Sequence, residues 1–136
     1  MSAVFYHIFL LFIPSDAKPV KHFQEEKIYT VSEVSVKPQP VKGLNDFHSR
    51  WEKKVVYPEV AVKANVQGIV FVEFVVNHDG AIINPAIRSG ISEECDEAAL
   101  KGFKEVSKES WKPAVKNGQP VKVKMVLPFA FRIINR

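Results

Sequence analysis

The sequence has almost no cysteine, because Cys95 is the single one among 136 residues. A disulfide needs two cysteines, so no internal disulfide framework holds this chain together. The four histidines, His7, His22, His48 and His78, are scattered, and none has a second ligand at the spacing of a zinc site. We therefore interpret them as surface or tail residues, and we expect no metal and no cofactor.

Residues for enzyme chemistry are also scarce. Glu93, Glu94, Asp96 and Glu97 form a cluster, but they stand at the beginning of an expected helix, where carboxylates complement the helix dipole. No histidine or nucleophile is placed to act with them, and the sequence has no phosphate-binding glycine loop and no Cys–His pair. Cys95 is interpreted as a residue of the same helix terminus. These absences predict that the protein is not an enzyme and has no catalytic residues.

A nucleic-acid-binding surface is missing as well, although one part of the chain is basic. Residues 100–136 carry nine Lys or Arg against Glu105 and Glu109, while the whole chain has a net charge of +4. The positive charges are spread over an expected helix, turn and strand, without an Arg cluster or an aromatic stacking platform. We expect a solvated face or a field that steers an acidic partner, and no nucleic acid.

No hydrophobic run has the length of an ordinary transmembrane helix. The apolar stretch at residues 3–14 is followed by Ser15, Asp16 and Ala17, a small-x-small pattern that suits signal-peptide cleavage. Twelve residues fall short of the roughly 20 that span a bilayer as a helix. We expect residues 1–17 to be a signal peptide that exports the chain, with a short membrane segment that anchors it as the alternative.

The composition is sufficient for one folded domain and a tail. Hydrophobic residues make up 46% and charged residues 25%, which is typical of globular proteins. Residues 18–50 are polar and punctuated by prolines, and we expect a partly extended lead-in there, with a short strand between Lys27 and Lys37. Residues 51–136 are expected to form the domain.

Three segments predict helices by the spacing of their apolar residues. Residues 44–55 form the first helix, with Asn45 or Asp46 as its N-cap. Residues 58–65 form about two turns that begin at Pro58, because proline suits a first helical position, where its missing N–H would have no partner. Residues 92–111 form the third.

Three further segments predict strands, at residues 69–76, 81–89 and 120–134. The first of them is apolar on both faces, which is typical of a central strand. Proline cannot donate to a sheet ladder, so Pro85 and Pro128 indicate that the second and third strands are edges. We therefore predict an α+β fold, a three-stranded antiparallel sheet in the order 2-1-3 with two helices packed on one face.

The third strand presents a long edge that is poorly protected. Lys122, Lys124 and Pro128 protect it only in part against pairing with another chain, and natural proteins usually protect such edges more thoroughly. An edge left open in this way is often a docking site.

A series of eight short motifs, taken in order, resembles the C-terminal domain of TonB, the periplasmic energy transducer. The resemblance covers residues 56–133, and the order of the motifs carries it more than any single one. The motifs are Tyr57-Pro58, the alanine-containing helix that follows, Gly68 before IVFVEFVV, Asp79-Gly80, DEAAL at 96–100, WKPA at 111–114, NGQPV at 117–121 and LPFAFRI.

The resemblance implies a fold and a binding function. TonB C-terminal domains capture the TonB box, an extended segment of outer-membrane TonB-dependent transporters, by β-augmentation, and so support energy-coupled uptake of siderophores, cobalamin or glycans. An anchored chain would also meet an inner-membrane proton-channel complex; either form would face the periplasm. The implied partner-binding residues are Tyr57, Pro58, Val121, Lys122, Val123, Lys124, Met125, Val126, Leu127, Phe129 and Phe131.

Two other functions without energy transduction remain open at this point. One is an unanchored periplasmic adaptor. The other is a structural envelope module that forms a homodimer through Ile69, Phe71 and Val75 on the outer face of the central strand. Cover of that face by the N-terminal tail is an equal alternative.

Overall fold

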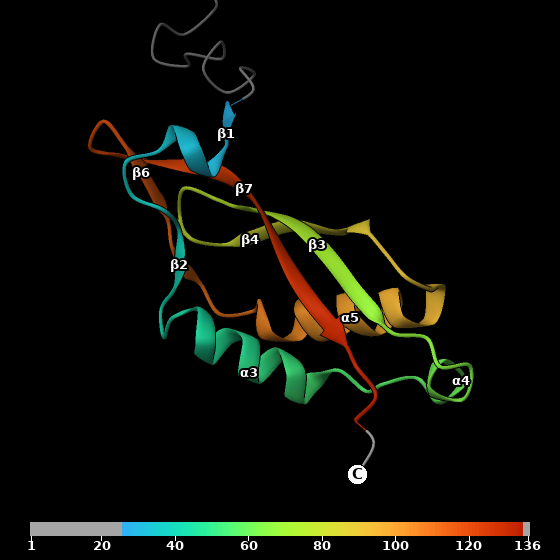
Figure 1. Cartoon of the computed structure of the whole chain (residues 1–136). Helices are drawn as coiled ribbons and strands as arrows, with labels where there is room; N and C mark the ends of the chain where they lie inside the picture. Colours follow the sequence, from blue (N-terminus) through green and yellow to red (C-terminus); the bar gives the residue numbers. More distant parts are fainter. Residues whose placement is uncertain (1–25, 135–136) are drawn as a thin grey trace, which may run out of the picture.

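The computed structural model describes residues 26–134, and the chain folds there as a small α+β domain (Figure 1). The elements are, in chain order, β1 (Ile28–Tyr29), the 3-10 turn η1 (Val31–Glu33), β2 (Gln39–Pro40), α3 (Leu44–Lys54), α4 (Glu59–Lys63), β3 (Gly68–Val76), β4 (Ile82–Ser89), α5 (Glu93–Val106), β5 (Trp111–Lys112), β6 (Ala114–Lys116) and β7 (Gln119–Phe131).

The main sheet has β3 at its centre, between β4 and β7. Both neighbours run antiparallel to β3, and the β3–β7 ladder continues without a register shift from Gly68↔Phe131 to Val76↔Val123. The predicted fold class and the central order are therefore confirmed. The strand number is larger than predicted, because β1 and β6 also pair with β7 and give a sheet of five strands.

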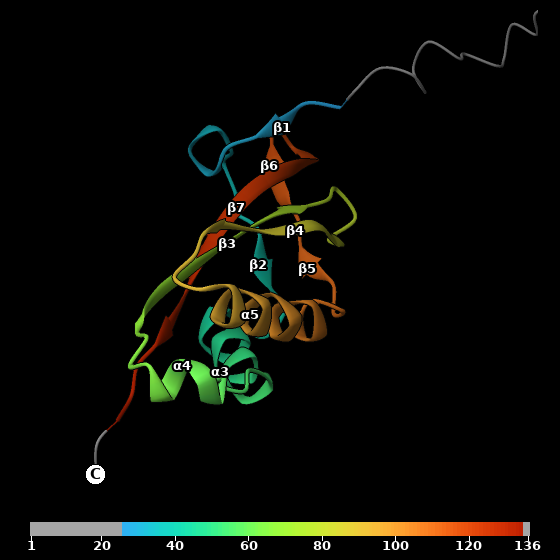
Figure 2. The same ribbon diagram turned by 90° about the vertical axis from the view of Figure 1, so that its right-hand side faces the viewer.

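One face of the sheet carries the core, and the helices cover it (Figure 2). Val70, Val72, Phe74 and Val76 alternate along β3 and are fully buried, because every second strand residue points to the same face. An aromatic group from α3, α5, β3, β5 and β7 fills the space between the layers, with ring centroids of Phe74 and Phe103 4.8 Å apart. Helices on one face are what the sequence predicts.

Helix α3 begins earlier than its predicted cap. Gly43, with a φ of 90°, is the N-cap residue, and neither Asn45 nor Asp46 caps the helix. Glycine can take this conformation without strain, so the helix starts without a side-chain cap. Phe47 and Trp51 point into the core as expected.

Helix α5 begins as predicted but ends earlier. Ser92 is its N-cap and accepts a hydrogen bond from the Cys95 amide. The helix ends at Val106, and Trp111 belongs to β5, where its amide donates to the Gly80 carbonyl at 2.8 Å. A Cβ on Gly80 would lie 2.0 Å from the Trp111 carbonyl oxygen, so the β3–β4 turn needs glycine to pack against β5.

Residues 26–43, here called the strap, pack along the domain. The strand predicted between Lys27 and Lys37 is reduced to β1, because Thr30 and Glu33 form a capping box that starts η1 instead. Further along, the amides of Ser35 and Val36 both donate to the Val115 carbonyl. Strand β2 then pairs with β5, so the strap joins the domain at three places.

No helix within residues 26–134 has the length and apolar character needed to cross a membrane. The signal peptide or membrane segment predicted at residues 1–17 lies outside the described residues.

Candidate partner-binding edge

The β7 edge is defined here as the main chain of residues 120–131 on the side that faces away from β3. Val123 pairs with Val76 of β3 on one side and with Tyr29 of β1 on the other. Strand β1 therefore lies on the β7 edge. Among the described residues, no strand pairs with this edge beyond Val123, so it is open from Lys124 to Phe131.

Two prolines indicate which main-chain groups point out from the β7 edge. Pro120 pairs with Val115 of β6, and Pro128 pairs with Phe71 of β3. Proline sits in a sheet with its nitrogen away from the paired strand. Both are even-numbered residues of one strand, and strand residues alternate in the direction of their main-chain groups. The even-numbered residues of β7 therefore direct their N–H and C=O groups to the β7 edge.

This alternation leaves a short window of hydrogen-bond donors. Between the two prolines, the residues with outward amides are Lys122, Lys124 and Val126. Strand β1 covers the first two, because in a parallel ladder a residue bonds to both neighbours of the residue opposite it, and Tyr29 lies opposite Val123. The open donor between the prolines is therefore that of Val126.

The side chains of β7 divide between two faces. Val123, Leu127, Phe129 and Phe131 are buried in the core, and Met125 packs against it. These side chains hold β7 against the core, so they are not available for contact with a partner at the β7 edge. The opposite face carries Lys122, Lys124 and Val126, together with half-buried or exposed residues of β3.

Charges near the β7 edge are paired only loosely. The Lys122 ammonium lies 3.5 Å from Glu26, and that of Lys124 lies 3.9 Å from Glu73, which also pairs with Arg88 at 3.1 Å. Surface pairs of this kind contribute at most about 1 kcal/mol each. The Lys124 side chain is 49% exposed, so its charge is available to a ligand.

Tyr57 lies at the far end of β7 from β1. Its phenol donates a hydrogen bond to the Val66 carbonyl, and its ring meets that of Phe131 edge-on, with centroids 5.1 Å apart. Burial raises the pKa of Tyr57 above its usual value. The ring is thus fixed at the side of a hollow of about 130 Å³. That hollow is lined by Val55, Tyr57, Phe129, Ala130, Phe131 and Arg132.

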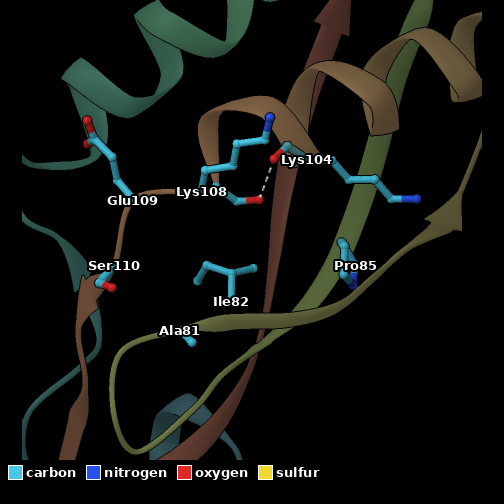
Figure 3. Close-up of a pocket in the computed structure, with 8 residues that line it drawn as sticks. Ala81, Ile82, Pro85, Lys104, Lys108, Glu109 and Ser110 are labelled. Carbon is cyan, nitrogen blue, oxygen red and sulfur yellow. Dashed lines mark hydrogen bonds between the residues drawn. The ribbon is translucent and has the colours of Figure 1, made fainter.

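A second hollow, of about 470 Å³, lies at the β4 edge of the sheet, between β4 and the end of α5 (Figure 3). Ile82 projects from β4 toward α5, and Lys104 and Lys108 lie across from it. The Ser107 hydroxyl already donates to the Lys104 carbonyl. The lining combines the apolar side chains of Ala81, Ile82 and Pro85 with the charged side chains of Lys104, Lys108 and Glu109.

The candidate residues from Val121 to Phe131 lie along β7, and Tyr57 lies beside the end of this strand. Pro58 lines a different hollow, together with Lys54, Val56 and residues of α5. Sequence reasoning missed the contacts of Glu26, Ile28 and Tyr29 with the edge, although the alternating pattern from Lys27 was their signal.

A family model described as Gram-negative bacterial TonB protein C-terminal matches residues 53–133. This match spans more than half of the chain. The chain belongs to this family. The TonB C-terminal domain is a protein-interaction domain, and proteins that contain it belong to the cell envelope.

Two solution structures of the C-terminal domain of Helicobacter pylori TonB share the fold. The longer fragment has a TM-score of 0.54 at 22% identity, with 66% of this chain and 79% of that chain covered. The shorter one has a TM-score of 0.53 at 22% identity, with 65% and 90% covered. No curated protein sequence matches the chain.

The TonB match begins at residue 53, so the strap and most of α3 precede it. The matched region contains β3, β4, α5 and the whole of β7. The strand that carries the β7 edge is therefore part of the TonB C-terminal domain, whereas the segment that covers the beginning of this edge is not.

Proposed function

We propose that the β7 edge captures an extended segment of an outer-membrane TonB-dependent transporter, the TonB box, by strand addition. The open part of the edge from Lys124 to Phe131 carries this proposal. On its other side β7 is held by the uninterrupted ladder with β3. The strand therefore needs no reorganisation to accept a new neighbour, which lowers the cost of binding.

Main-chain hydrogen bonds would supply most of the affinity in this mode. Each contributes about 0.5–1.5 kcal/mol net. The outward amide of Val126, with the outward carbonyls around it, allows a short ladder. Pro128 has no N–H to donate, but its carbonyl still accepts a hydrogen bond. Main-chain pairing of this kind requires an extended partner segment and makes few demands on the sequence of that segment.

Side chains at the two ends of the open edge would add selectivity. The exposed charge of Lys124 favours acidic residues in the incoming segment. The hollow beside Tyr57 has an apolar floor formed by Phe129 and Phe131, and an apolar side chain of the segment fits it. Pro58 fixes the chain next to Tyr57 and so adds to this end of the site.

Capture of a transporter segment places the domain in the periplasm, with export by residues 1–17. An anchored chain would draw on an inner-membrane proton-channel complex and support energy-coupled uptake, such as that of siderophores. An unanchored chain would act as an adaptor that binds the same segment without transmitting force.

The test is a pair of substitutions at one position. Val126→Pro removes an outward amide and leaves the ladder with β3 intact, while Val126→Ala keeps the amide and shortens the side chain. The ligands are synthetic peptides that represent the N-terminal segments of the TonB-dependent transporters of the same bacterium. Titration calorimetry should show binding to the wild type and to Val126→Ala, and a loss of about tenfold or more with Val126→Pro. Equal affinity of a folded Val126→Pro variant would refute strand addition here.

A homodimer is the second candidate, and two exposed side chains favour it. Ile69 and Phe71 on the outer face of β3 are 42% and 36% exposed, whereas Val75, the third residue of the predicted interface, is only 4% exposed and is not available to a second copy. Sedimentation equilibrium of the wild type and of Phe71→Ser separates the two functions. A concentration-dependent dimer that Phe71→Ser abolishes supports association, whereas a monomer at all concentrations excludes it.

A further inference from the structure

Strand β1 occupies the position that an added strand would take. It runs parallel to β7, with Ile28 opposite Lys122 and Tyr29 opposite Val123. Figure 1 shows it beside the beginning of β7, far from the end near the C-terminus. The protein thus already carries a strand of its own on the β7 edge.

The pairs that β1 occupies matter because the donor window is short. Pro120 and Pro128 bound the window, and the outward amides between them are those of Lys122, Lys124 and Val126. With β1 in place, an incoming strand reaches one of these three donors, because Tyr29 opposite Val123 engages both Lys122 and Lys124. With β1 released, it reaches all three in an uninterrupted row, which is the longest row of donors that this edge offers.

The contacts that hold β1 are few and lie at the surface. Ile28 is 45% exposed. The Lys27 and Lys116 ammonium groups lie 4.6 and 5.1 Å from the centre of the Tyr29 ring, and Glu26 lies 3.5 Å from Lys122. Exposed cation–π contacts and surface ion pairs contribute about 1 kcal/mol or less each. A two-residue strand held in this way opens at a low free-energy cost.

The strap beyond β1 is fixed more firmly. The amides of Ser35 and Val36 donate to the Val115 carbonyl, and the Val115 amide donates back to the Val36 carbonyl. Pro38 is fully buried, and β2 pairs with β5. Release of β1 therefore leaves it tethered a few residues from the β7 edge, where its effective concentration is high.

We propose that β1 is a tethered cap that competes with the transporter segment for the beginning of the β7 edge. This inference rests on the proposed function. An incoming strand that pairs with Lys122 displaces β1, and β1 returns when the strand leaves. The apparent affinity for the segment is reduced by the fraction of molecules in which β1 is paired.

Two variants of the full chain shift this competition in opposite directions. The double variant Ile28→Gly and Tyr29→Gly removes the β-branched and aromatic side chains and weakens β1. The double variant Ile28→Cys and Lys122→Cys locks β1 to the β7 edge when oxidised and frees it when reduced. The matched control for the glycines is Val41→Gly, because Val41 is 60% exposed and belongs to the strap but not to β1.

The probes are the synthetic transporter peptides described under the proposed function. Titration calorimetry measures their affinity for each variant. We expect the glycine variant to bind about threefold to tenfold more tightly than the wild type and Val41→Gly. We expect the oxidised cysteine variant to bind at least about tenfold more weakly than its reduced form. Amide exchange at Lys122 should slow when peptide binds the glycine variant.

The possible results separate this inference from the proposed function. If Val126→Pro abolishes binding while the locked and glycine variants bind like the wild type, strand addition stands and the cap is refuted. Weaker binding by the glycine variant would show that β1 belongs to the binding surface, which also refutes the cap. If no peptide binds even the glycine variant, both proposals fail.

Discussion

The indole N–H of Trp51 donates a hydrogen bond to the main-chain carbonyl of Ala99 at 2.9 Å. Trp51 belongs to α3 and Ala99 to α5, and both are fully buried. This bond joins the two helices of the layer that supports β3 and β7. We therefore expect Trp51 to contribute to the free energy of unfolding of the domain, although it lies outside the matched TonB region.

Replacement of Trp51 by phenylalanine should lower the free energy of unfolding by about 1–3 kcal/mol. The change removes one buried hydrogen bond and part of a core side chain. Urea unfolding measures the effect. Val60→Ala is the control, because Val60 is 58% exposed, and should stay within about 0.5 kcal/mol of the wild type. An equally small effect of Trp51→Phe would contradict the role given to this contact.

Replacement of Gly102 by alanine tests the close approach of α3 and α5. A Cβ at this position would lie 2.6 Å from Cγ2 of Val55. Alanine favours a helix by about 1 kcal/mol over glycine, but overpacking costs about 1–3 kcal/mol. Because the overpacking cost exceeds the helix preference of alanine, we expect a net loss of stability, measured by urea unfolding.

A double-mutant cycle checks the cause of that loss. Val55→Ala removes the methyl group that the new Cβ would meet, so Gly102→Ala should be better tolerated in this background. A coupling of about 0.5 kcal/mol or more, measured by urea unfolding, is expected for side chains in contact. Additive effects would show that the two positions do not meet.

The pH dependence of stability tests the environment of Tyr57. Its pKa is raised in the folded protein, mainly by burial. A raised pKa means that the phenol stabilises the fold fully below the pKa of the unfolded chain, about 10, and that this contribution is lost as pH rises through the folded pKa. We expect the wild type to lose stability more steeply than Tyr57→Phe above about pH 10. Parallel urea midpoints of the two proteins from pH 9 to 11 would contradict this.

Charge on the β7 edge should influence the rate of partner capture. Lys124→Gln removes an exposed positive charge beside the open donor, and we expect it to slow association with acidic peptides about twofold to fivefold. The expected effect decreases with salt, since surface charges are screened. Lys63→Gln, which makes the same change of net charge at a 75% exposed side chain of α4, should leave the rate unchanged. Stopped-flow measurements at two ionic strengths distinguish the variants.

The sequence predicted the parts of the fold that depend on long, regular patterns. Alternation in β3 identified the buried face, because Val70, Val72, Phe74 and Val76 share one side. The prolines at positions 85 and 128 predicted two edge strands, which is confirmed for β4 but only in part for β7, because β1 pairs with the beginning of β7. Both signals extend over many residues, so local conformational preferences did not obscure them.

Short elements were not predictable in the same way. Trp111–Lys112 and Ala114–Lys116 are too short for a period to be counted, and both depend on partners distant in the sequence. The glycine N-cap of α3 has no side chain that signals its role. The position of β1 depends on β7, more than ninety residues later in the chain, so an alternating pattern at Lys27 could not indicate which strand it would join.

The strap gives the domain a defined order of mechanical failure. A load applied at residue 26 first reaches β1, which is held by two residue pairs, then the hydrogen bonds of Ser35 and Val36 with Val115, and then the β2–β5 connection, which has two residue pairs. These contacts carry the load one at a time and therefore break in sequence. The β3–β7 ladder, from Gly68↔Phe131 to Val76↔Val123, distributes a load along its axis over all its pairs at once. Tension from the N-terminal side would therefore uncover the β7 edge before it disturbs the strand that carries it.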